Sequence, residues 1–167
     1  MSLTSYFSVP QQISRDRLLF TIPWLSTEWI LSFDFIMTKT TWTDCDWANL
    51  LHLTITGNRD DYGGRIPAIY IECSTRKLFV FSSISGNGNF IHEIKQINPN
   101  VLYHIEIHQR YTSGGNYRFF VRIDGVETIP VINTDARQFY NVKVYASDPF
   151  YIPVDCVISN LHHTNFL

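Results

Sequence analysis

Apolar and polar residues alternate in short segments along most of the chain. The clearest case is the stretch 102–125, in which Tyr103, Ile105 and Ile107 alternate with polar side chains and a second alternating segment follows at 117–123. Successive side chains of a β-strand point to opposite faces, so each segment can bury one apolar row. The turn between them contains glycine and asparagine, which tolerate the positive φ that a hairpin needs. We therefore expect two antiparallel strands here.

Similar segments recur along the chain and are separated by turns rich in glycine, asparagine and proline. They lie at 29–35, 51–56, 69–71, 91–97, 142–145 and 157–163, and the unbroken apolar run 78–81 predicts a further strand that is covered on both faces. No apolar period of 3.6 residues persists for three turns, so we expect little or no helix. Many short strands in one chain predict an all-β fold, a two-sheet antiparallel sandwich of the jelly-roll type. We expect a single domain over 1–167, in which 1–14 form an N-terminal arm or edge strand.

Composition supports a packed body and excludes two kinds of partner. Of the 167 residues, 45% are hydrophobic and 15% aromatic, enough for a substantial core. The formal net charge of −2 gives no general attraction to phosphate backbones, so we expect no nucleic-acid partner. No apolar run approaches the roughly 20 residues that a transmembrane helix requires.

Three segments towards the C-terminus carry a family resemblance. They are 119–127 (FFVRIDGVE), 142–150 (VKVYASDPF) and 157–161 (VISNL). This order of strand, Asp-Gly turn, strand end and closing strand resembles a concanavalin A-like jelly roll of the laminin-G-like kind, and the likeness extends from about Trp29 to His163. It implies a lectin-like or cell-adhesion module that binds glycans or extracellular proteins, in some cases through calcium at the rim. Folds of this kind also serve glycoside hydrolases, so the fold alone does not fix the function.

The loop 41–49 is the first candidate for ligand binding. Trp42 and Trp47 can stack on a sugar ring, while Asp44 and Asp46 offer carboxylate oxygens to calcium. The alternative interpretation is that the aspartates cap turns and the tryptophans belong to the core.

The loop 58–65 is the second candidate, because binding residues concentrate on loops held by a rigid scaffold. Four of its residues are predicted to contact the ligand, namely Arg59, Asp60, Tyr62 and Arg65. Asp61 is predicted to be a further calcium ligand. Asp148, in the turn 147–151, is predicted to contact the same ligand. An ordinary solvated hairpin tip would also explain the polarity of the loop.

The residues of this sequence support a catalytic site or a transition-metal site less well. His104, Glu106 and His108 share one face of a strand and can be read as metal ligands, but simple alternation explains the same pattern. The closely spaced acidic run of jelly-roll glucanases and the Gly-x-Ser-x-Gly elbow are both missing. We therefore expect no enzymatic activity.

The cysteines leave pairing and compartment open. Of Cys45, Cys73 and Cys156, we favour a Cys73–Cys156 disulfide, because Cys45 lies among loop-like residues; free thiols are the alternative. The N-terminus lacks the pattern of a signal peptide. We still expect an extracellular protein, with a cytoplasmic one not excluded.

The sequence therefore predicts a non-catalytic module that binds a glycan or glycoprotein through loops at one edge of a sandwich, with calcium as the candidate cofactor. A structural domain that self-associates into a homo-oligomer is the alternative, and a carbohydrate-active enzyme is the third. The sequence does not name the ligand, the calcium dependence, the oligomeric state or the edge that binds.

Overall fold

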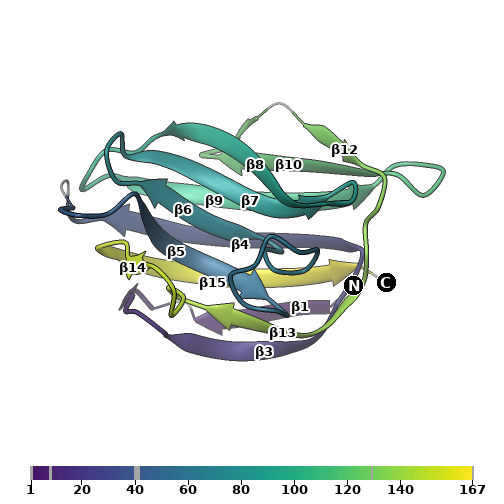
Figure 1. The fold of residues 1–167 in the computed structure, drawn as a ribbon, viewed down its shortest axis with the longest axis horizontal. Coiled ribbons are helices and arrows are strands. Elements are labelled where there is room, and N and C mark those ends of the chain that lie inside the picture. The colour runs from purple at the N-terminus through teal and green to yellow at the C-terminus, as the bar shows by residue number, and fades with distance from the viewer. Residues whose placement is uncertain (1, 8, 40–41, 129, 167) are drawn as a thin grey trace.

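Two β-sheets packed face to face form the structure, a computed structural model that describes residues 2–7, 9–39, 42–128 and 130–166 (Figure 1). The elements in these ranges are all strands, joined by turns and loops. The pairing between neighbouring strands is antiparallel with one exception in the described residues, a short parallel pair between β14 and β5. The predicted all-β sandwich is confirmed.

Sheet A has eight strands. In spatial order they are β1 (Ser2–Phe7), β15 (Cys156–Phe166), β4 (Glu28–Met37), β9 (Leu102–Tyr111), β10 (Tyr117–Ile123) and β11 (Val126–Glu127), with β12 (Val131–Asn133) paired to β10 and β2 (Gln11–Gln12) paired to β15.

Sheet B has seven strands. In spatial order they are β3 (Leu18–Leu25), β13 (Phe139–Tyr145), β5 (Trp47–Thr54), β6 (Ala68–Glu72), β7 (Lys77–Ile84) and β8 (Asn87–Gln96), with β14 (Ile152–Pro153) paired to β5.

The core lies between the sheets and follows the sequence alternation closely. In β4 every second side chain is buried, and Phe33 and Phe35 are completely so. In β9 the predicted row of Tyr103, Ile105 and Ile107 is buried in the same layer. Burying one such side chain stabilises the fold by about 1.5–3 kcal/mol, so these rows fix which face of each strand points inward.

A disulfide joins Cys45 to Cys73, and the predicted Cys73–Cys156 pair is wrong. The pairing of β5 with β6 explains the result. Trp47 lies opposite Glu72, which brings the residues just before β5 beside the residues just after β6. The Cα atoms of the two cysteines are 6.1 Å apart, within the usual range for a disulfide. Cys156 is a free thiol buried in the core, and burial raises its pKa.

The described residues contain no helix that is long and apolar enough to span a membrane.

Candidate functional site

An aromatic pocket opens on the outer face of sheet B, away from the core. Three of its walls come from neighbouring strands, one from the loop between β5 and β6, and one from the turn before β14. The lining residues are Trp47, Arg65, Tyr70, Phe81 and Tyr151, and the cavity they enclose measures about 40 Å³. We refer to these five residues as the aromatic pocket.

Strand alternation places the rings. In β6, Ile69 and Ile71 point into the core, so Tyr70 points outward. Phe81 of β7 lies opposite Ala68, one diagonal step from Tyr70 on the same face. The Tyr70 and Phe81 rings meet edge to face, with centroids 5.1 Å apart and planes at 78°. Trp47 meets Phe81 in the same way at 5.5 Å. Such contacts are the preferred geometry for aromatic pairs, so the rings hold one another in place.

Arg65 is held by side chains from its own loop and from two strands. Its side chain is only 8% exposed, and its Nη1 donates to Oδ1 of Asp60 at 2.7 Å. Its Nη2 donates to Oδ1 of Asn58 at 2.8 Å, and Nη1 also donates to Oδ1 of Asn89. The guanidinium carbon lies 5.3 Å from the centroid of the Phe81 ring. Charge-assisted bonds of this kind are the stronger protein hydrogen bonds, so the arginine is fixed rather than mobile.

Two glycines let the loop after β5 pack closely enough to reach this arginine. A Cβ at Gly64 would lie 2.1 Å from the carbonyl oxygen of Arg59 within the same loop. A Cβ at Gly88 of β8 would lie 2.3 Å from the carbonyl oxygen of Asp60. A side chain at Gly64 would distort the loop itself, and one at Gly88 would push the loop away from β8; either change would displace the carboxylate that pairs with Arg65.

A buried His52–Asp148 pair supports the pocket from beneath. The two side chains are fully buried, with His52 Nδ1 2.8 Å from Asp148 Oδ2, and His52 Nε2 lies 2.8 Å from the carbonyl oxygen of Gly64. The backbone N–H groups of Phe150 and Tyr151 donate to Asp148 Oδ1 at 3.0 and 2.9 Å. This single carboxylate therefore fixes the turn that carries the Tyr151 wall.

The tyrosine between the pair and the pocket is strongly perturbed. The Tyr70 hydroxyl lies 3.3 Å from Asp148 Oδ2 and donates towards it. Burial, followed by the nearby Asp148 charge, raises the pKa of Tyr70. Tyr70 therefore stays neutral and acts as a hydrogen-bond donor at physiological pH.

Four of the predicted ligand-binding residues are brought together here. Trp47 and Arg65 line the pocket, Asp60 pairs with Arg65, and Asp148 positions Tyr151. The strand residues Tyr70 and Phe81 were not predicted as site residues, and Tyr151 itself was given no role. The one usable signal in the sequence was the unbroken apolar run 78–81, which indicates a strand covered on both faces.

The other three lie elsewhere. Trp42 packs against the hydrophobic core, as the alternative interpretation for the tryptophans proposes. The Tyr62 ring stacks on Phe139 at 6.1 Å and under the Arg137 guanidinium at 4.0 Å, so its faces are already in contact with protein. Arg59 is exposed and pairs with Asp61 at 3.3 Å.

The predicted calcium ligands do not form a recognisable cluster. Asp44 and Asp46 are exposed, and Asp61 in the other loop accepts a hydrogen bond from the Thr56 hydroxyl at 2.9 Å. The described part of the chain contains no group of three or more His, Cys, Asp or Glu side chains arranged to hold a metal ion. Calcium binding therefore stays a prediction.

The His104–Glu106–His108 row lies on the outer face of sheet A and is engaged in protein contacts. His104 Nδ1 is 2.5 Å from Asp34, and Glu106 is 3.8 Å from Arg122. The His108 ring stacks on Phe120 at 4.5 Å, and burial is the main reason that its pKa is lowered. Alternation along an outward-facing strand accounts for this row.

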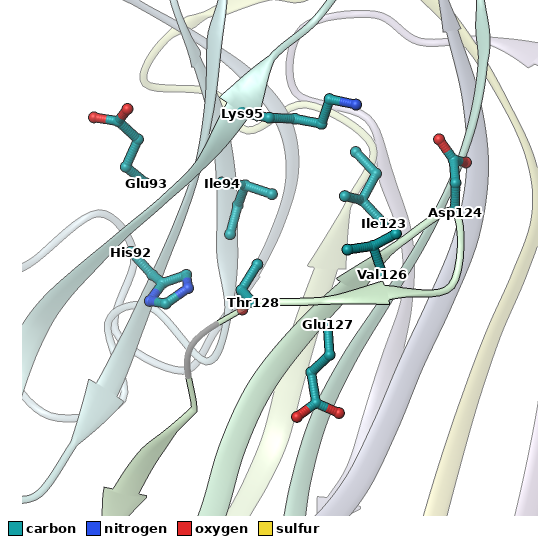
Figure 2. A pocket seen from close by; sticks show the side chains of 9 residues that line it. All are labelled: His92, Glu93, Ile94, Lys95, Ile123, Asp124, Val126, Glu127 and Thr128. Carbon is teal, nitrogen blue, oxygen red and sulfur yellow. The ribbon is translucent and has the colours of Figure 1, made fainter.

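A wider groove of about 510 Å³ lies at one side of the sandwich, between β8 of sheet B and β10–β11 of sheet A. Figure 2 shows the side chains of Ile94, Ile123 and Val126 in the middle of this groove. Its lining residues include aliphatic and charged side chains but no phenylalanine, tyrosine or tryptophan. The pairing of β8 with β7 is interrupted by bulges, a feature that discourages another strand from joining a sheet edge. The groove therefore offers neither a stacking surface nor a regular edge.

Comparison with known proteins places the fold. No protein-family model and no curated protein matches the sequence. A native heptameric SAP-like pentraxin from Limulus polyphemus superposes with a TM-score of 0.57 at 14% identity, covering 95% of this chain and 74% of the pentraxin. The alginate lyase Aly36B, a mutant in complex with alginate tetrasaccharide, gives 0.54 at 12% identity over 98% and 80% of the two chains. The galectin LEC-6 from Caenorhabditis elegans gives 0.50 at 10% identity over 97% and 95%.

These similarities show a concanavalin A-like jelly-roll sandwich, as the sequence motifs predicted. At such low identities they show the fold alone. The laminin-G-like subtype stays a prediction.

Proposed function

We propose that this protein is a non-catalytic, lectin-like module that binds a glycan or a glycoprotein through the aromatic pocket on sheet B. The observation that carries the proposal is that four aromatic rings and a fixed arginine line one pocket on the outer face of sheet B. Aromatic rings offer flat apolar surface to the C–H groups of a sugar, while a few placed polar groups fix its orientation. The lectin and alginate-bound lyase among the similar folds support a carbohydrate as the ligand class.

Asp60 supplies the polar contact at the rim. Its side chain is 73% exposed although one carboxylate oxygen is held by Arg65. The other carboxylate oxygen of this exposed side chain is suited to accept a hydrogen bond from a sugar hydroxyl. Trp47 and Tyr151, the two half-buried rings, are the walls that a sugar would contact first.

A glycan array tests the proposal, followed by titration of the best ligand with Trp47→Ala. Losing one stacked ring, at about 0.5–1.5 kcal/mol for an aromatic contact, should weaken binding by roughly 2- to 13-fold. Tyr111→Ala is the matched control, because Tyr111 is 51% exposed and lies on sheet A. A thermal melt of each variant checks that it folds. A blank array, or equal losses in both variants, would contradict the proposal.

Calcium, compartment and assembly complete the proposal. The Cys45–Cys73 disulfide supports an oxidising, extracellular location, because such bonds are rare in the cytosol. A calcium ion at 100 times its dissociation constant would stabilise the fold by about 2.7 kcal/mol, so a melting temperature unchanged by millimolar calcium would remove that ion from the proposal.

Two further measurements test the alternative functions. Sedimentation tests whether the protein self-associates. Release of products from a panel of polysaccharides would instead indicate an enzyme.

A further inference from the structure

The charged groups around the aromatic pocket balance one another. Arg65 is paired with Asp60 at 2.7 Å. His52 and Asp148 form a second pair, and their hydrogen bonds show how the pair is balanced. His52 Nε2 faces the Gly64 carbonyl oxygen, which can only accept, so this nitrogen carries a proton.

Asp148 Oδ1 accepts from the backbone N–H groups of Phe150 and Tyr151. His52 Nδ1 lies 2.8 Å from Asp148 Oδ2, and with one proton between these two atoms the pair as a whole is neutral. Arg65 with Asp60 and His52 with Asp148 are therefore two balanced pairs, and neither leaves a cation without a partner.

The pocket is also small. A volume of about 40 Å³ has room for only a few water-sized groups, since one water needs roughly 10–15 Å³ of such space. A whole pyranose ring cannot enter it. A short substituent on the ring would fit, with the ring itself outside the pocket against Trp47 and Tyr151.

We propose that the aromatic pocket receives the exocyclic hydroxymethyl group of a neutral hexose and discriminates against the corresponding uronic acid. This inference rests on the proposed carbohydrate-binding function and names the class of sugar. A carboxylate at the same position would lose hydration beside Asp60 and Asp148, and the nearest cations are already paired. A hydroxymethyl group carries no charge and can bond to Asp60 or to the Tyr70 hydroxyl.

Matched glycosides provide the experiment. The methyl glycosides of glucose, galactose and mannose differ from the methyl glycosides of glucuronate, galacturonate and mannuronate, respectively, only at C6. NMR titration of the full chain should show binding of at least one neutral member, with its uronate partner weaker by about tenfold or more, because an unpaired charge must be desolvated.

Asp60→Asn tests the cause of the discrimination. Removing this carboxylate leaves the Arg65 charge without its partner, so affinity for the uronate should rise and the difference within the pair should shrink. Asp155→Asn is the control with the same change in charge, because the Asp155 side chain forms an exposed ion pair with Lys39 at 3.4 Å. The control should leave the discrimination unchanged.

The outcomes separate this inference from the proposed function. Three results would overturn the inference while carbohydrate binding stands. They are equal binding within every pair, preference for the uronate, and an array hit without binding of any neutral hexoside. A discrimination that Asp60→Asn does not reduce would overturn its electrostatic basis. A blank glycan array would remove the proposed function itself.

Discussion

Acid should destabilise this protein through one buried histidine. His163 of β15 lies opposite Leu31, points into the sandwich and is 1% exposed. Its Nε2 is buried and has no hydrogen-bond partner in the described structure. The groove beside it is lined by uncharged residues, namely Thr4, Phe20, Thr21, Ile22, Pro23, Trp24 and Asn165. Burial without a charged partner lowers the pKa of His163 from 6.5 to about 4.

The size and sign of the effect follow from this pKa. The unfolded chain binds the proton near pH 6.5, while the folded protein resists it until about pH 4, so stability is lost as the pH falls between these values. At 1.36 kcal/mol per pKa unit, the full loss is about 3.4 kcal/mol, reached below pH 4. About 2 kcal/mol of this is already lost at pH 5, and almost none at pH 7.5.

Urea unfolding of the wild type and His163→Leu at pH 7.5, 6 and 5 measures this contribution. Between pH 7.5 and 5 the wild type should lose about 2 kcal/mol more unfolding free energy than the variant. Burial also lowers the pKa of His92 and His108, but they titrate in both proteins and their effects largely cancel. His163→Gln, which keeps a polar side chain without a titrating group, should behave like His163→Leu. Parallel pH curves for all three proteins would refute the reasoning.

Three further changes probe the disulfide, the core and the buried pair. Replacing Cys45 and Cys73 by serine opens a loop with a sequence separation of 28 and should cost about 3.5 kcal/mol in urea unfolding; an unchanged midpoint would contradict the loop-entropy argument. Phe33→Ala should cost about 3–5 kcal/mol, against less than about 0.5 for the control Ile132→Ala, whose side chain is 51% exposed. Asp148→Asn breaks the buried His52–Asp148 pair and should cost about 3–5 kcal/mol at pH 7, so a loss below 1 kcal/mol would contradict a supporting role for the pair.

The sequence predicted the strands well because one buried face imposes a period of two on the residues. The β9–β10 hairpin illustrates this, with Ile105 paired to Ile123 and Ile107 to Val121 as alternation requires. Alternation says nothing about which strands become neighbours. The disulfide was missed for that reason, since only the β5–β6 register brings Cys45 beside Cys73.

The candidate site was only partly predicted, and the reason is related. Trp47, Arg65 and Asp148 stood out because they lie in or beside polar loops, where ligand contacts concentrate. Tyr70 and Phe81 lie within strands and read as core residues. Their outward direction becomes meaningful only once the sheet places them together and the loop 58–65 folds over one side of them.

The Cys45–Cys73 bond encloses most of the candidate site in one covalent ring. Trp47, Arg65 and Tyr70 all lie between the two cysteines, as do Asn58 and Asp60, which hold the arginine. A ring of this kind restricts the pocket before any ligand arrives, so little conformational entropy remains to be lost on binding. Reduction of the bond should therefore make ligand association entropically less favourable, even where the sheet itself stays folded.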